Sequence, residues 1–208
     1  MNATHRAAVL IGHGGVPTDY PREKVRRLMA LEHARRARDA APSAEEEALD
    51  RGVRCHPRTP QTDPYKFGFE RLAQTLASRL DDRPLYTAYN EFCAPSVPEA
   101  VADAIRQGAT EITLLSAMMT PGGSHAEVEI PELAESLQRI HPAVKIRYAW
   151  PFDLDAVASV LEQQVRTWDL KGELAVRDTL ESAPGAALRE RSRRVEGELA
   201  IPHEQQHE

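Results

Sequence analysis

The feature that most constrains the fold of this sequence is an apolar run that ends in a glycine turn and a histidine. Residues 112–119 form such a run, which is typical of a parallel strand buried on both faces. The run breaks at Thr120-Pro121-Gly122-Gly123, where glycine allows a tight turn and a close approach to a ligand, and His125 follows directly. This stretch therefore predicts a buried strand with an imidazole just beyond its carboxyl end.

The same order of elements occurs near the start of the sequence. An apolar run at residues 7–11 leads into Gly12-His13-Gly14-Gly15. In an open α/β sheet, groups just past the carboxyl ends of neighbouring strands converge on one crevice. We therefore expect His13 and His125 to face each other there.

The rest of the sequence alternates between short apolar runs and segments with helical periodicity. This alternation predicts an α/β fold of the flavodoxin-like kind, a four-stranded parallel sheet in the order 2-1-3-4 with helices on both faces. Asp63-Pro64 is a typical helix start, because an N-cap residue precedes a proline at the first helical position. Further strands are expected at residues 85–89 and 144–150, and helices at residues 63–80, 95–108, 131–140 and 153–168.

Two segments do not fit this alternation. We interpret residues 19–62 as a charged insertion, with a basic helix over residues 22–38 and a short acidic helix that begins at Ser43. A solvated surface excursion is the simpler alternative, since runs of charge are usually solvated. The α/β domain, with this insertion, is expected to span residues 1–168, and residues 169–208 are expected to form a charged arm that is partly helical or disordered.

Length, charge and cysteine content exclude several classes of protein. A chain of 208 residues is long enough for one domain with a substantial core. Its net charge of −6 argues against general nucleic-acid binding, and no run approaches the ~18 apolar residues of a membrane span. Cys55 and Cys93 are too few for a disulfide framework, and the first residues do not resemble a signal peptide. We therefore expect a cytoplasmic protein without nucleic-acid or membrane partners.

Three side chains stand at the expected strand ends: His13, Glu91 and His125. Two neutral imidazoles and a carboxylate suit a divalent metal such as cobalt, iron or zinc. The same groups can take up protons near neutral pH. A lone histidine after a glycine turn is more often structural, but two histidines and a glutamate at the functional edge of one sheet favour a site.

Three sequence blocks carry a resemblance to a known family. They are Leu10-Ile-Gly-His-Gly, Tyr89-Asn-Glu-Phe-Cys-Ala-Pro-Ser and Pro121-Gly-Gly-Ser-His-Ala-Glu-Val-Glu-Ile-Pro. In this order they resemble the small sirohydrochlorin chelatases (class II tetrapyrrole chelatases), the cobalt and iron chelatases of cobalamin and sirohaem synthesis. The resemblance covers residues 7–11 and 64–165, but neither the insertion nor the tail. One departure is Gly15, where the family often has serine.

The resemblance implies a lyase that inserts cobalt or iron into sirohydrochlorin or a related tetrapyrrole. The divalent metal is then a substrate held by His13 and His125, no organic cofactor is needed, and the protein is a homodimer. His13 also accepts pyrrole protons, and Glu91 binds metal or substrate, so His13, Glu91 and His125 are the expected catalytic residues. The expected substrate-binding residues are Gly14, Gly15, Glu91, Thr120, Pro121, Gly122, Gly123 and Ser124.

Sirohydrochlorin carries many carboxylates, so cations are expected around its pocket. The candidates are Arg58, Lys66 and the basic helix of the insertion.

Other functions remain open at this stage. A tetrapyrrole or metal carrier would use the same residues without turnover. A serine hydrolase is a further alternative, because Gly122-Gly-Ser-His-Ala nearly matches a nucleophile elbow, with Ser124 as nucleophile. His203-Glu-Gln-Gln-His207 formally matches the zinc-protease motif but lacks a buried helix and a third ligand.

Overall fold

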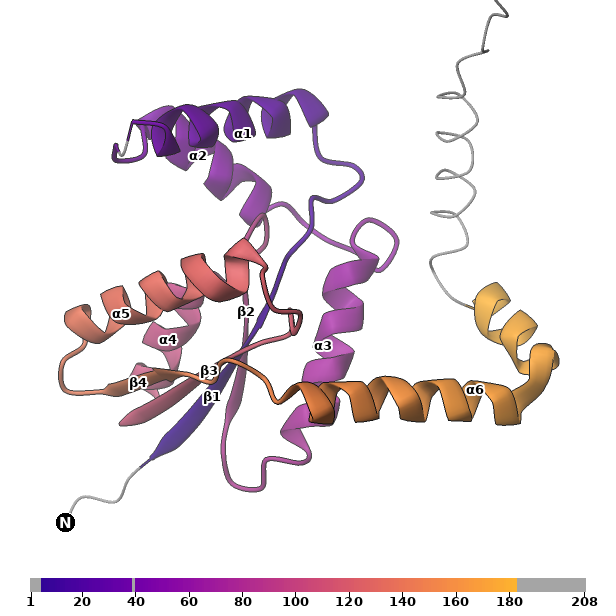
Figure 1. Cartoon of the computed structure of the whole chain (residues 1–208). Coiled ribbons are helices and arrows are strands. Elements are labelled where there is room, and N and C mark those ends of the chain that lie inside the picture. Colours follow the sequence, from indigo (N-terminus) through magenta and orange to yellow (C-terminus); the bar gives the residue numbers. More distant parts are fainter. Residues whose placement is uncertain (1–4, 39, 183–208) are drawn as a thin grey trace, which may run out of the picture. The chain divides into compact units, whose positions relative to one another are not determined.

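The first 157 residues are organised around a four-stranded parallel sheet (Figure 1). The structure is a computed structural model that describes residues 5–38 and 40–182. The strands lie in the order β2-β1-β3-β4, which confirms the predicted flavodoxin-like α/β fold and its strand order. Their bounds are β1 (Arg6–Gly12), β2 (Leu85–Tyr89), β3 (Glu111–Ser116) and β4 (Lys145–Tyr148).

Three helices follow the strands and cover the two faces of the sheet. Helix α3 (Pro64–Ala77) begins where the Asp63 side chain accepts a hydrogen bond from the Lys66 main-chain N–H, as the Asp-Pro pair predicts. Helix α4 (Val97–Arg106) begins with a capping box between Ser96 and Glu99. Helix α5 (Ile130–Ile140) carries buried Ile130, Ala134 and Leu137.

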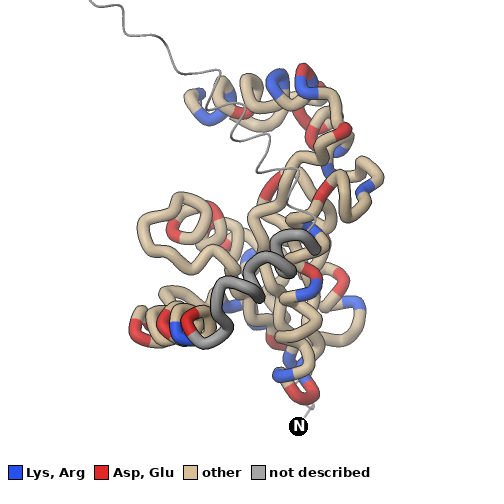
Figure 2. Tube along the Cα trace, turned by 90° about the vertical axis from the view of Figure 1, so that its right-hand side faces the viewer, with Lys and Arg blue, Asp and Glu red and all other residues tan. Residues whose placement is uncertain are grey.

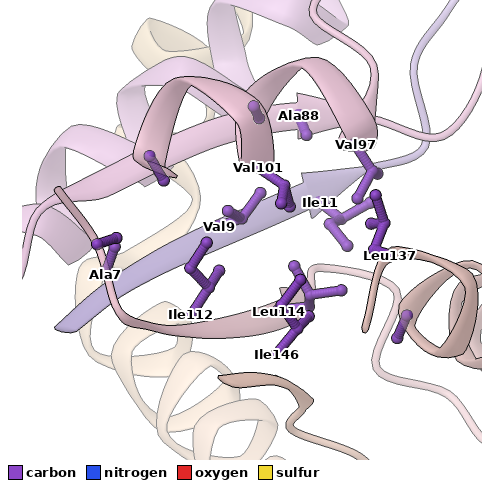
Figure 3. Close-up of a cluster of buried hydrophobic side chains, with 14 of the residues drawn as sticks. Ala7, Val9, Ile11, Ala88, Val97, Val101, Ile112, Leu114, Leu137 and Ile146 are labelled. Atoms are coloured by element: carbon purple, nitrogen blue, oxygen red, sulfur yellow. The ribbon is translucent and has the colours of Figure 1, made fainter. Parts of the chain in front are cut away.

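The core lies on both faces of the sheet because alternate residues of β1 point to opposite sides. Val9 and Ile11 pack with α4 and α5 in the larger cluster, which Figure 3 shows together with Val101 and Leu137. Leu10, between them in sequence, belongs to a second cluster with Phe69 and Ala73 of α3. The near-continuous apolar run of β1 thus reflects burial on both faces.

The insertion forms a helical hairpin made of α1 (Arg22–Arg36) and α2 (Ala44–Arg54). Figure 2 shows cations and carboxylates side by side on it, because basic α1 pairs with acidic α2. Arg27 pairs with Glu45, and Arg35 with Glu46. Tyr20, Leu28 and Val53 form a small buried cluster under the hairpin. The ends of the insertion meet where the Thr18 N–H donates to the Thr62 carbonyl at 2.9 Å.

Some boundaries differ from the sequence-based expectation. Strand β3 ends at Ser116, because the Ser116 hydroxyl accepts a hydrogen bond from Met118 N–H and the chain leaves the sheet. His125 does not lie in a loop before α5: it begins a π-helix, η1 (His125–Glu129), which runs directly into α5. Strand β4 is confined to Lys145–Tyr148.

The last described helix, α6 (Leu154–Ser182), extends well beyond the predicted end at Trp168. The chain divides into two units, Met1–Val157 and Ala158–Glu208, and α6 begins in the first and continues into the second. Residues 183–208, including the His203–His207 motif, lie outside the described residues. Within the described part of the chain, no helix has the length and apolarity needed to cross a membrane.

We predict that the buried and exposed leucines of the first unit differ sharply in their contribution to stability. Leu114 on β3 is fully buried, whereas Leu72 on α3 is 54% exposed. Leu114→Ala should lower the free energy of unfolding by about 2–5 kcal/mol, because it leaves a cavity in the larger cluster. The matched change Leu72→Ala should cost less than about 1 kcal/mol. Urea denaturation measures both, and equal losses would contradict this placement of the core.

Candidate metal centre

Main-chain pairing between β1 and β2 continues beyond the sheet and brings two loops together. The Asn90 N–H donates to the Gly12 carbonyl, and the Glu91 N–H to the His13 carbonyl, both at 2.9 Å. Gly14 has a φ of +91°, and a Cβ at this position would lie 1.9 Å from the Glu91 carbonyl oxygen. Residue 14 must therefore be glycine for the His13 loop and the Glu91 loop to lie this close.

The surroundings of His13 fix the orientation of its ring. Its main-chain N–H donates to the Tyr65 hydroxyl at 2.8 Å. Its Nδ1 lies 2.8 Å from the Gly14 carbonyl oxygen, which can only accept a hydrogen bond. The proton must therefore be on Nδ1 of the neutral ring, which leaves the lone pair of Nε2 available to a metal.

His125 also carries its proton on Nδ1, but its hydrogen-bond partners differ from those of His13. Its Nδ1 lies 3.0 Å from Glu129 Oε2 and 2.9 Å from Asn90 Nδ2. Because a carboxylate only accepts, Nδ1–H donates to Glu129, and the Asn90 amide donates to the same oxygen at 3.1 Å. Nε2 is again left with its lone pair, on the side of the ring that faces Glu91.

The three candidate ligands converge at one point. The rings of His13 and His125 have centroids 4.9 Å apart and stand nearly perpendicular. His125 Nε2 lies 3.9 Å from Glu91 Oε1, and one ligand atom from each of the three residues lies within 4.8 Å of the other two. Bonds of about 2.0–2.2 Å to one ion would require these atoms to move inward by about an ångström or less. The arrangement can therefore bind a divalent metal through two nitrogens and one oxygen.

The carboxylates around the site differ in their electrostatic surroundings. Burial by itself would raise the pKa of Glu129, but hydrogen bonds from Asn90 and His125, with the charges of His125 and Arg36, hold this pKa below its usual value. Burial and repulsion from Glu91 raise the pKa of Glu32 on α1. Arg36, one turn further along α1, pairs with Glu129 at 3.5 Å. The insertion helix therefore reaches the surroundings of His125.

The remaining predicted residues fall into two groups. Gly14 is buried beneath Glu91, while residues 120–124 form an exposed loop immediately before His125. Within residues 5–38 and 40–182, no hydrogen bond links Ser124 to an imidazole, so the geometry gives a serine hydrolase no support.

The expectation that Arg58 and Lys66 surround the substrate is wrong. Arg58 is buried against main-chain carbonyls and Asp63, and Lys66 pairs with Glu70. Two arginines of the basic helix, Arg27 and Arg35, pair with α2.

Sequence reasoning missed three residues that position the ligands: Tyr65, Asn90 and Glu129. The spacing of His125 and Glu129, four residues apart at the start of a helix, was a usable signal, since such residues meet on one helical face. Asn90 immediately precedes Glu91 and could have been noticed for that reason. Nothing in the sequence connects Tyr65 with His13.

Two cavities in the first unit are lined by residues other than the three candidate ligands. One of about 530 Å³ lies between α2 and the loop after β2, and its lining includes Arg51, Arg54 and Asn90. The other, about 540 Å³, lies at the opposite edge of the sheet, by Arg6 and Asp81. The first shares Asn90 with the candidate site and so lies directly beside it.

Fold and site together define a parallel α/β protein with a candidate metal site of two histidines and one carboxylate at the carboxyl edge of its sheet. A model of the CbiX family matches residues 62–167, just over half of the chain, and the chain belongs to this family. This confirms the sirohydrochlorin chelatase-like family expected from the three sequence blocks. The match begins where the insertion ends.

Solved structures with related folds are more distant. SirB from Bacillus subtilis with Fe3+ has a TM-score of 0.46 and 16% identity, and the match covers 76% of this chain and 46% of that chain. A CbiX protein from Marinobacter aquaeolei has a TM-score of 0.46 and 17% identity, and the match covers 78% of this chain and 99% of that chain. The sirohydrochlorin chelatase SirB from Bacillus subtilis subspecies spizizenii, in complex with cobalt, has a TM-score of 0.40 and 16% identity. The match covers 78% of this chain and 51% of that chain. The chain thus spans about half the length of the two SirB proteins. No curated protein matches it in sequence.

We predict that Gly14→Ala weakens metal binding. The added Cβ would collide with the Glu91 carbonyl oxygen, so the two ligand loops must separate. Affinity for Co2+, followed by its visible absorption, should fall by at least about tenfold. Gly108→Ala is a matched control, because Gly108 has the same φ of +91° but open space around its Cβ position. If both variants bind Co2+ like the wild type, the collision does not matter to the site.

We also predict that Glu129→Gln lowers Co2+ affinity by about 10- to 100-fold, the usual effect of losing the hydrogen-bond partner of a metal-bound histidine. The glutamine keeps the length of the side chain but loses the charge that orients His125 Nδ1–H. Glu127→Gln, an exposed carboxylate in the same π-helix, is the control. Equal affinities for the two variants would show that Glu129 does not orient the ligand.

Proposed function

We propose that this protein is a metal chelatase that inserts a divalent cobalt or iron ion into sirohydrochlorin or a closely related tetrapyrrole. The observation that carries the proposal is the convergence of one ligand atom each from His13, His125 and Glu91 at the carboxyl edge of the sheet, with His125 Nε2 3.9 Å from Glu91 Oε1. Membership of the CbiX family supports it independently. We further propose that His13, Glu91 and His125 are the catalytic residues and that the metal is a substrate held by the two histidines.

The proposed reaction exchanges two pyrrole N–H protons for one divalent cation. As the ion passes to the macrocycle, the protein ligands lose it and regain their lone pairs. His13 Nε2 and the Glu91 carboxylate can then accept the two protons, so charge is balanced at the point of exchange. His125 donates to Glu129, which Asn90 holds in turn, so His125 keeps its orientation throughout. The chain thus supplies both the site that holds the metal and the bases that accept the two protons released by the macrocycle.

The exposed loop over residues 120–124 is the proposed contact for the tetrapyrrole, together with Gly14, Gly15 and Glu91. This loop leads directly into His125, so a macrocycle lying against it would have its centre near the candidate ligands. Arg51, which lines the neighbouring cavity, can supply a cation for the carboxylates of the substrate.

We propose a homodimer in the cytoplasm. Helix α6 supports the dimer because it exposes large apolar side chains spaced three, four or seven residues apart, which form one stripe on a helix. The residues of this stripe are Leu154, Leu161, Val165 and Trp168, and Val160, which does not share this spacing, is exposed as well. The cytoplasmic location rests on Cys55 and Cys93, which are both free thiols, as expected in a reducing compartment.

Insertion of Co2+ into sirohydrochlorin, followed by visible absorbance, tests the proposed activity. His13→Ala and His125→Ala should each lower the rate by about 100-fold or more, because each loses a ligand, and His13→Ala also loses a base. His33→Ala, an exposed histidine of α1, should retain the wild-type rate. Binding of metal and tetrapyrrole by the wild type without insertion would instead identify a carrier.

A further inference from the structure

Two arginines at the end of the insertion donate hydrogen bonds to the loop that carries Glu91. Arg54, the last residue of α2, donates from Nη2 to the Asn90 carbonyl and from Nη1 to the Cys93 carbonyl, both at 3.0 Å. Its Nε pairs with Asp50, so its charge is neutralised within α2. The two carbonyls lie on either side of Glu91 in sequence.

Arg58 connects the same loop to the loop of His13. Its Nη2 donates to the Phe92 carbonyl and, at 3.0 Å, to the Val53 carbonyl. Its Nη1 donates to the Gly15 carbonyl at 2.7 Å and pairs with Asp63, the residue that caps α3. The side chain is only 4% exposed. Arg58 thus bridges the insertion, the two ligand loops and the first turn of α3.

These bonds do more than attach the hairpin to the domain. The Glu91 loop leaves the sheet after Tyr89, and Phe92 has a φ of +53°, a conformation that a large residue rarely adopts without support. The carbonyls of Asn90, Phe92 and Cys93 all accept from the two guanidinium groups. A planar guanidinium can hold two carbonyls in a fixed relation, whereas a lysine ammonium cannot reproduce that geometry.

We propose that Arg54 and Arg58 form an arginine clamp that sets the position of Glu91, and through Gly15 that of His13, for metal binding. The insertion is then a working part of the metal site, although the family match begins only at residue 62. The two arginines are positioning residues, since they contact the main chain of the ligand loops and not the ligand atoms. This inference rests on the proposed metal site, but not on turnover.

The first test compares Arg54→Lys and Arg58→Lys with Arg27→Lys. Arg27 is the matched control, because it makes a two-pronged pair with Glu45 in the same insertion but is 56% exposed. Both clamp variants should lower Co2+ affinity by about tenfold or more and change the visible spectrum of the bound ion. Arg27→Lys should do neither. Wild-type affinity in both clamp variants would overturn the proposal.

A double-mutant cycle with Glu91→Ala separates positioning from general stability. Arg54 is the better partner for the cycle, because of the two ligand loops it contacts only that of Glu91, and it is less buried than Arg58. If the clamp acts through Glu91, Arg54→Lys should cost about tenfold in Co2+ affinity when Glu91 is present and less than about twofold when it is absent. The same loss in both backgrounds would show a merely structural role and overturn the proposal.

The readout also separates this inference from the proposed function. If the wild type binds Co2+ but does not insert it into sirohydrochlorin, the chelatase proposal is contradicted and the clamp proposal is not. If Glu91→Ala binds Co2+ as tightly as the wild type, the clamp proposal is overturned, whether or not the wild type inserts the metal. Melting temperatures measured on every variant confirm that the compared proteins are folded.

Discussion

The candidate metal site depends on main-chain pairing between β1 and β2 that continues where the sheet ends. The N–H groups of Asn90 and Glu91 donate to the carbonyls of Gly12 and His13, so two ligand-bearing loops are fixed to each other like neighbouring strands. Gly14 permits this approach because a side chain there would occupy the place of the Glu91 carbonyl. The positions of His13 and Glu91 thus derive from the sheet itself, which is more rigid than a free loop.

The fold was predictable from the sequence because parallel strands buried on both faces appear as near-continuous apolar runs. The strand order is that of the flavodoxin-like fold, and the closeness of the three polar side chains follows from the rule that the carboxyl ends of parallel strands meet at one edge. The π-helix at His125 was not predictable, since a wider helical turn has no apolar period of its own. It nevertheless matters, because His125 and Glu129 are in contact within it.

Charge was the least informative part of the sequence. Arg58 and Lys66 belong to a class of residue that recognises carboxylates on a substrate, yet the structure directs them to internal partners. The difference lies in burial: Arg58 is 4% exposed and is surrounded by carbonyls that need donors, a property that no local pattern reveals. Basic α1 and acidic α2 are likewise joined by two ion pairs, so two runs of charge that look like separate binding surfaces form one hairpin.

The openness of the proposed metal site suits transfer of a metal better than permanent storage. The Gly14 carbonyl and Glu129 each accept a hydrogen bond from an Nδ1–H, so each Nε2 keeps its lone pair, and one ligand atom of each histidine lies close to Glu91. Structural zinc sites usually close the ion within four protein ligands. Here three ligands from three segments converge, and His125 and Glu91 keep 22% and 25% of their side-chain surface exposed. Because the ligand set is incomplete and open to solvent, an ion can be gripped on one side while a second molecule approaches from the other.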